Sequence, residues 1–199
     1  MLIVFYGPDG SGKSTLIEGL RQKIPSHELY HFAPILIPRR PQLLSKQKRV
    51  EAGRPYGASA WPTSLSFIKL VYYILDFLAF RVLVLFKRLS RRAPKVYIFD
   101  RYFLDFKYDK ERNRLSLPDG VVSLCYKMFI PKPDLEFYLV GDPSTISSRK
   151  NEITIEEASK LVENYKAGAT QELGLLVNST ERSIDECGSD IFDQVCEFK

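Results

Sequence analysis

The stretch GPDGSGKST, residues Gly7 to Thr15, matches the phosphate-binding pattern G-x-x-x-x-G-K-S/T in full. Glycines in such a loop let the backbone wrap closely around an anion, with successive N–H groups pointing inward. The positive end of a following helix adds to the field. We therefore predict a nucleotide-phosphate site made by Gly7, Gly10, Ser11, Gly12, Lys13, Ser14 and Thr15.

The sequence on both sides of this loop supports the prediction. The apolar run LIVFY at residues 2–6 is typical of a buried strand, and Leu16, Ile17 and Leu20 give the next segment an apolar helical face. Strand, loop and helix in this order are the context that separates a phosphate loop from a chance Gly-rich turn.

The polar side chains of the loop suggest separate roles. Lys13 is expected to reach the β and γ phosphates of a nucleotide, and Thr15 the α phosphate. The Ser14 hydroxyl suits a Mg²⁺ ion that bridges phosphates, because magnesium takes oxygen ligands.

A second signal is VYIFDRY at residues 96–102, a buried strand that ends in an acid and a base. Asp100 is a candidate Mg²⁺ ligand, directly or through water, and Arg101 a candidate phosphate clamp. The alternative is a structural ion pair that closes the strand.

Composition indicates one domain: the chain has 199 residues, of which 45% are hydrophobic. Its three cysteines have no C-x-x-C spacing and only two histidines accompany them, so we expect free thiols in a reducing cytoplasm and no nitrogen–sulfur metal site. The N-terminus lacks the basic leader of a signal peptide.

Net charge +5 permits a nucleic-acid partner, but the basic residues at 39–54 and 87–95 lack interleaved aromatic residues, so nucleic-acid binding is not expected. The apolar segment 67–89 is interrupted by Lys69, Asp76 and Arg81, which makes it a poor membrane-spanning helix. We expect instead a helix that is buried or that forms a dimer, and no membrane partner.

Apolar runs at 2–6, 29–32, 96–99, 135–140 and 175–177 alternate with helical patterns. This order predicts an α/β three-layer fold with a parallel sheet and a ligand at the carboxyl ends of the strands. The proline-containing, basic segment 34–62 reads as an irregular excursion over the site.

These residues resemble the thymidylate kinases within the P-loop nucleoside monophosphate kinases. The loop fits that family's G-x-D-G-x-G-K-S-T form, including Asp9, and Asp100-Arg101-Tyr102 is similar to its D-R-Y/H motif. Phe77 and Arg81 resemble its F-x-x-x-R segment, and a four-residue spacing puts both on one helix face.

The resemblance implies a P-loop kinase domain over residues 1–199 with five strands in the order 2-3-1-4-5 and a short lid at about 147–156. It implies transfer of the γ-phosphoryl group of ATP, with Mg²⁺, to a nucleoside monophosphate such as dTMP. The segment 67–89 would form a homodimer contact. The implied acceptor-binding residues are Asp9, Arg39, Phe77, Arg81, Arg101 and Tyr102.

Phosphoryl transfer needs positive charge near the moving group. Some thymidylate kinases carry an arginine in the loop after the aspartate, where this chain has Gly10. Arg149 and Lys150 of the lid are therefore the candidates, the alternative being two solvated charges at a helix end.

The acceptor side departs from the family. The residues after Tyr102 do not form the A-Y-Q-like element of the family. The family also has a phosphate-binding segment after the second strand, and in this chain only the residues around Arg39 are comparable to it. The charged run 105–114 is either a solvated loop or a rebuilt acceptor pocket. A sugar or sugar phosphate acceptor, and an inactive nucleotide-binding or scaffold protein, stay open as alternatives. A GTP-dependent switch is not expected, because the guanine-reading N-K-x-D sequence does not occur.

Overall fold

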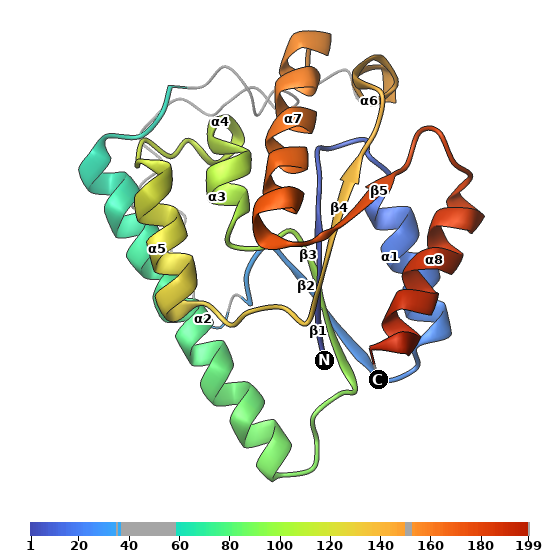
Figure 1. The fold of residues 1–199 in the computed structure, drawn as a ribbon. Coiled ribbons are helices and arrows are strands. Elements are labelled where there is room, and N and C mark those ends of the chain that lie inside the picture. The colour runs from blue at the N-terminus through green and yellow to red at the C-terminus, as the bar shows by residue number, and fades with distance from the viewer. Residues whose placement is uncertain (35, 37–58, 150–152, 199) are drawn as a thin grey trace. The chain divides into compact units, whose positions relative to one another are not determined.

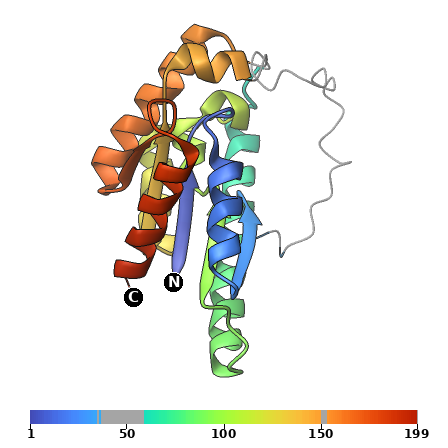
Figure 2. The same cartoon turned by 90° about the vertical axis from the view of Figure 1, so that its right-hand side faces the viewer.

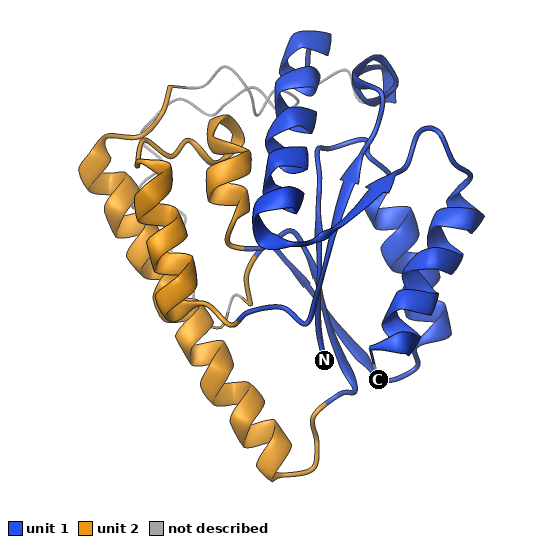
Figure 3. Ribbon diagram, viewed as in Figure 1, with its two compact units in different colours: residues 1–32, 94–102, 132–199 blue, residues 33–93, 103–131 orange. Residues whose placement is uncertain are grey.

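The computed structural model describes residues 1–34, 36, 59–149 and 153–198. The chain divides into two compact units (Figure 3). Unit 1 comprises residues 1–32, 94–102 and 132–199, and unit 2 comprises residues 33–93 and 103–131. Unit 2 therefore consists of two insertions into the sequence of unit 1.

Unit 1 contains a five-stranded parallel sheet (Figure 1). Its strands are β1 (Leu2–Tyr6), β2 (His27–His31), β3 (Val96–Asp100), β4 (Leu135–Val140) and β5 (Leu175–Asn178), in the order β2-β3-β1-β4-β5. This confirms the expected α/β fold and strand order. Because the strands are parallel, the loop after β1 and the ends of β2 and β3 meet at one edge.

Helices cover both faces of this sheet (Figure 2). They are α1 (Lys13–Lys23) and α8 (Ile184–Glu197) on one face and α7 (Ile155–Glu172) on the other, while α6 (Pro143–Arg149) packs against α7. Ile3, Phe5 and alternate residues of the neighbouring strands form one core with α1 and α8. The strand residues between them point to the other face, where α7 packs against β4.

Unit 2 contains α2 (Thr63–Leu89), α3 (Asp105–Tyr108), α4 (Lys110–Asn113) and α5 (Asp119–Phe129). The buried side chains of α2 recur at helical spacing, at Leu70, Tyr73, Phe77 and Phe80 among others. The helix expected at 67–89 is present, and it begins four residues earlier, at Thr63. No helix in the described ranges is long and apolar enough to cross a membrane.

The charged run 105–114 is not a solvated loop. It forms α3 and α4, and the side chains of Asp105 and Asp109 are buried. Asp109 accepts a hydrogen bond from the backbone N–H of Arg112, so its burial is compensated at the start of α4. Of the two interpretations of this run, the solvated loop is therefore wrong, because sequence spacing does not show which charged side chains lie inward.

All three cysteines are free thiols, as expected. Most of the excursion expected at 34–62 lies outside the described residues.

Candidate phosphate-binding site

Three glycines give the loop after β1 its shape. Gly7, Gly10 and Gly12 have φ angles of +143°, +88° and +83°, a region that other residues rarely adopt. A Cβ atom on Gly7 would lie 2.4 Å from the carbonyl oxygen of Leu139 in β4. The loop can therefore pass close to the sheet only with glycine at this position.

Lys13 is the first residue of α1, and its side chain folds back into the loop. Nζ donates hydrogen bonds to the carbonyl oxygens of Gly7 and Pro8, both at 2.7 Å. The residue is only 5% exposed. A buried ammonium group thus lies inside the ring of loop residues where an anion would bind.

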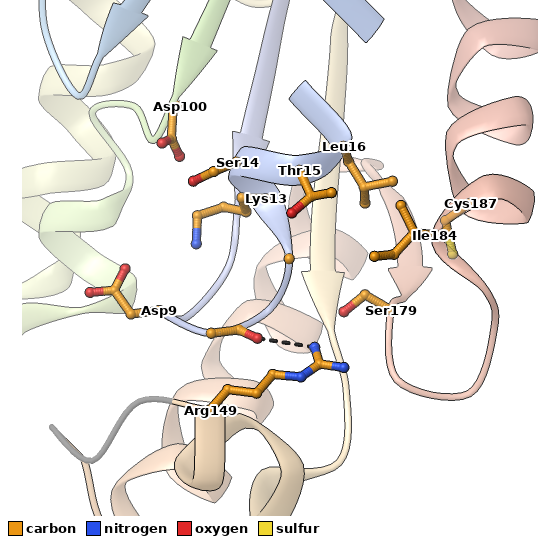
Figure 4. A pocket seen from close by; sticks show the side chains of 12 residues that line it. Asp9, Lys13, Ser14, Thr15, Leu16, Asp100, Arg149, Ser179, Ile184 and Cys187 are labelled. Atoms are coloured by element: carbon orange, nitrogen blue, oxygen red, sulfur yellow. Dashed lines mark hydrogen bonds between the residues drawn. The ribbon is translucent and has the colours of Figure 1, made fainter. Parts of the chain in front are cut away.

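A cavity of about 460 Å³ opens beside this loop (Figure 4). It is lined by most of the residues predicted to bind the nucleotide donor. The predicted residues Gly7 and Ser11 do not line it, but they belong to the same loop. The lining residues are Asp9, Gly10, Gly12, Lys13, Ser14, Thr15, Leu16, Asp100, Arg149, Ser179, Ile184 and Cys187.

Asp100 ends β3, the neighbour of β1, and lines this cavity together with Ser14. Its Oδ1 atom is buried and has no hydrogen-bond partner among the described residues. A buried carboxylate oxygen without a partner is costly unless a ligand satisfies it. This oxygen and the Ser14 hydroxyl are the hard oxygen donors that Mg²⁺ prefers, so the residues fit the ion.

Arg149 ends α6, and Nη1 of its guanidinium donates a hydrogen bond to the carbonyl oxygen of Gly10, at 3.2 Å. The backbone of α6 also lies against Gly10, because a Cβ atom there would be 2.9 Å from the carbonyl oxygen of Ile146. The loop therefore has no room for a side chain at Gly10, and Arg149 brings a positive charge to the same place.

Asp142 fixes the start of α6. Its carboxylate accepts hydrogen bonds from the Ser144 hydroxyl and from the Thr145 backbone N–H, the latter at 2.8 Å. These bonds, first that of Ser144, lower the pKa of Asp142. The carboxylate thus stays ionised as a helix cap near neutral pH.

Arg101 pairs with Asp9 and not with Asp100. Its Nη2 donates a hydrogen bond to Oδ1 of Asp9 at 2.7 Å, and its Nη1 donates to the Tyr165 hydroxyl at 3.4 Å. The side chains of Arg101 and Asp9 are 9% and 16% exposed. Arg101 has a φ of +73°, an unusual conformation for a non-glycine residue.

The other predicted acceptor residues occupy different environments. Tyr102 in unit 1 is fully buried, edge-on to Phe99. In unit 2, Phe77 is fully buried and Arg81 is exposed on α2. Their roles toward an acceptor stay predictions. Arg39 and Lys150 lie outside the described residues.

Besides Leu16, which was predicted only as part of an apolar helix face, sequence reasoning missed four described residues. Ser179, Ile184 and Cys187 line the cavity from the turn after β5 and from α8, and burial raises the pKa of the Cys187 thiol. The fourth, His31, ends β2 with Nδ1 3.3 Å from Oδ2 of Asp100. A capping box at Ser183 and Glu186 signals the start of α8, but no sequence pattern marks His31.

Neither a protein-family model nor a curated relative matches the sequence. Solved structures with the same fold include deoxyadenosine kinase from M. mycoides with dCMP and a flexible dCDP bound, at 18% identity and a TM-score of 0.56 over 100% of both chains. The same enzyme with bound dATP is 17% identical, with a TM-score of 0.56 over 98% of this chain and 100% of that one. Thymidylate kinase from Ehrlichia chaffeensis is 16% identical, with a TM-score of 0.57 over 98% of both chains. The chain therefore has the P-loop kinase fold expected from the sequence.

Proposed function

We propose that this chain is an ATP-dependent phosphotransferase that moves the γ-phosphoryl group of ATP to a nucleoside monophosphate, with dTMP as the first choice. The observation that carries the proposal is the complete phosphate loop, with the Lys13 ammonium inside it and the Arg149 guanidinium on the Gly10 carbonyl. A protein that only binds a nucleotide does not need the positive charge of Arg149 beside the loop. Phosphoryl transfer does need such a charge, because negative charge on the transferring group must be stabilised.

Lys13 and the loop amides would hold the donor. When ATP binds, the ammonium exchanges the carbonyl oxygens of Gly7 and Pro8 for phosphate oxygens of higher negative charge. Ser14 and Asp100 would hold Mg²⁺, which would neutralise part of the negative charge of the bound phosphates. Arg149 would turn from the Gly10 carbonyl to the transferring group, as part of a lid at about 147–156.

On the acceptor side, Arg101 would bind the acceptor phosphate and Asp9 would orient the acceptor's hydroxyl group. Their ion pair already holds the guanidinium of Arg101 in place before the acceptor binds. Less conformational entropy of this side chain is then lost on binding. Arg39, Phe77, Arg81 and Tyr102 remain proposed contributors. We regard the two units as one kinase domain, cytoplasmic as the free thiols suggest.

A hydroxyl acceptor is the second candidate. Two of the structural neighbours are named deoxyadenosine kinase, which is a nucleoside kinase, and the chain lacks the A-Y-Q-like element of thymidylate kinases. A sugar or sugar phosphate belongs to the same class of alternative.

We further propose a homodimer through α2. A stripe of exposed apolar side chains runs along this helix opposite its buried face, a pattern typical of interfaces. The stripe comprises Ile68, Val71, Leu75, Val82, Phe86 and Leu89.

The test is an ADP-release assay with ATP and Mg²⁺ against dTMP, dUMP, other nucleoside monophosphates, deoxynucleosides and sugar phosphates. Lys13→Ala is the blank and should lose at least about 100-fold in turnover with its fold retained. Turnover on dTMP supports the first proposal, and turnover only on deoxynucleosides or sugars supports the second. ATP binding without turnover on any acceptor would support the scaffold alternative. An unaltered rate in Lys13→Ala would refute the mechanism.

A further inference from the structure

His31 and Asp100 face each other across the edge of the sheet. The two residues are paired in register between β2 and β3, and the backbone N–H of Phe32 donates to the Asp100 carbonyl oxygen at 2.9 Å. The ladder therefore fixes the backbone of His31 beside Asp100. Its Nδ1 lies 3.3 Å from Oδ2 of the carboxylate, slightly beyond the usual hydrogen-bond range. The imidazole is 72% exposed, so little packing opposes the small rotation that would shorten this contact.

The two oxygens of Asp100 have different surroundings. Oδ2 faces His31, while Oδ1 is buried without a partner among the described residues, and the side chain as a whole is only 15% exposed. Asp100 lines the same cavity as Ser14 and Lys13. An imidazole N–H on one oxygen fixes the rotation of the carboxylate and leaves the other, buried oxygen to be satisfied by a bound ligand.

We infer that His31 is a positioning residue, which holds Asp100 by Oδ2 so that Oδ1 is presented to the metal ion of a metal–nucleotide complex. This inference rests on the proposed function, since it assumes that the cavity binds a nucleotide with a divalent ion. The interaction with Asp100 requires only that Nδ1 of His31 carry a hydrogen. Carboxylates that bind metals are commonly held in this way by a hydrogen-bond donor outside the coordination shell.

The chain offers a matched control, because its only other histidine, His27, begins the same strand. The ring of His27 contacts the Ile24 carbonyl oxygen at 2.6 Å and Nε of Arg21 at 3.0 Å. It is paired in register with Val96, at the other end of β3 from Asp100. Loss of a histidine from β2 can thus be separated from loss of the contact with Asp100.

The experiment measures Mn²⁺ affinity by electron paramagnetic resonance, in the presence of a saturating non-hydrolysable ATP analogue, for the whole protein. We expect His31→Ala to weaken Mn²⁺ binding by about 10-fold or more. His31→Asn should recover most of this loss, because the Asn amide nitrogen can take the place of Nδ1. His27→Ala should bind Mn²⁺ as the wild type does. The affinity for the analogue without metal should be equal in all four proteins.

Wild-type Mn²⁺ affinity in His31→Ala would overturn the inference, and so would an equal loss of metal-free analogue binding, which would mean a general defect of the site. If His31→Ala does not fold, as judged by circular dichroism, His31→Val takes its place, because valine suits a strand and has no hydrogen-bond donor. Failure of the proposed function has a different signature. In that case the wild-type protein would show no nucleotide-dependent Mn²⁺ site, or Lys13→Ala would bind the analogue as tightly as the wild type.

Discussion

Replacing Gly10 by alanine should destabilise the protein more than the same change at Gly12. Both glycines have left-handed φ angles, +88° and +83°, so alanine suffers similar backbone strain at each, about 1–2 kcal/mol. Part of that strain, about 0.4–1 kcal/mol, is offset because alanine restricts the unfolded chain. The difference lies in the space around each Cβ atom: at Gly12 nothing lies within 4 Å, whereas at Gly10 the Ile146 carbonyl oxygen would be 2.9 Å away.

That oxygen belongs to the backbone of α6, so it cannot rotate aside as a flexible side chain would. Crowding in a packed region costs about 1–3 kcal/mol, which is the expected difference between the two variants. A difference of about 2 kcal/mol corresponds to roughly 4–8 °C in melting temperature for a chain of this size.

The assay is urea unfolding and thermal melting of Gly10→Ala and Gly12→Ala without nucleotide, which keeps phosphate contacts out of the comparison. Equal stabilities of the two variants would show that α6 does not lie against the loop, and would remove the steric reason for assigning the catalytic charge to Arg149.

Arg149, the Arg101–Asp9 ion pair and the apolar stripe each lead to a further prediction. Arg149→Ala should lower kcat by about 10²–10³ with a similar KM for ATP, measured by ADP release, and a loss confined to KM would contradict its role. Arg101→Ala should lower the free energy of unfolding by about 1.5–3 kcal/mol, because it removes the 2.7 Å ion pair with the Asp9 carboxylate, whose side chain is only 16% exposed; the double variant with Asp9→Ala should lose less than the sum of the two single variants, which denaturant titration can check. Phe86→Asp should shift the mass from dimer to monomer in light scattering, and a monomeric wild-type protein would refute the α2 contact.

The sequence was most informative where local chemistry alone decides the structure. The glycines at 7, 10 and 12, with an apolar strand before them, admit few conformations, and the structure has the predicted loop between β1 and α1. The strand order was also predicted correctly, although it came from the resemblance and not from periodicity.

Contacts between distant segments were less predictable. The pairing of Arg101 with Asp9, and of His31 with Asp100, depends on which strands lie next to each other and on how β2 and β3 are aligned. A single sequence contains no local signal for either. The interior positions of Asp105 and Asp109 were missed for the same reason, since a mixed charge run does not show which of its members face inward.

The order of the strands has a consequence for synthesis on the ribosome. β1 and the phosphate loop leave the ribosome before β3 and β4, which are the neighbours of β1 in the sheet and begin at Val96 and Leu135. At about 5–20 residues per second, roughly 5–20 s pass before even β3 is available. During this time the apolar LIVFY strand has no native partner, so the nascent chain is a candidate client for chaperones that shield such segments.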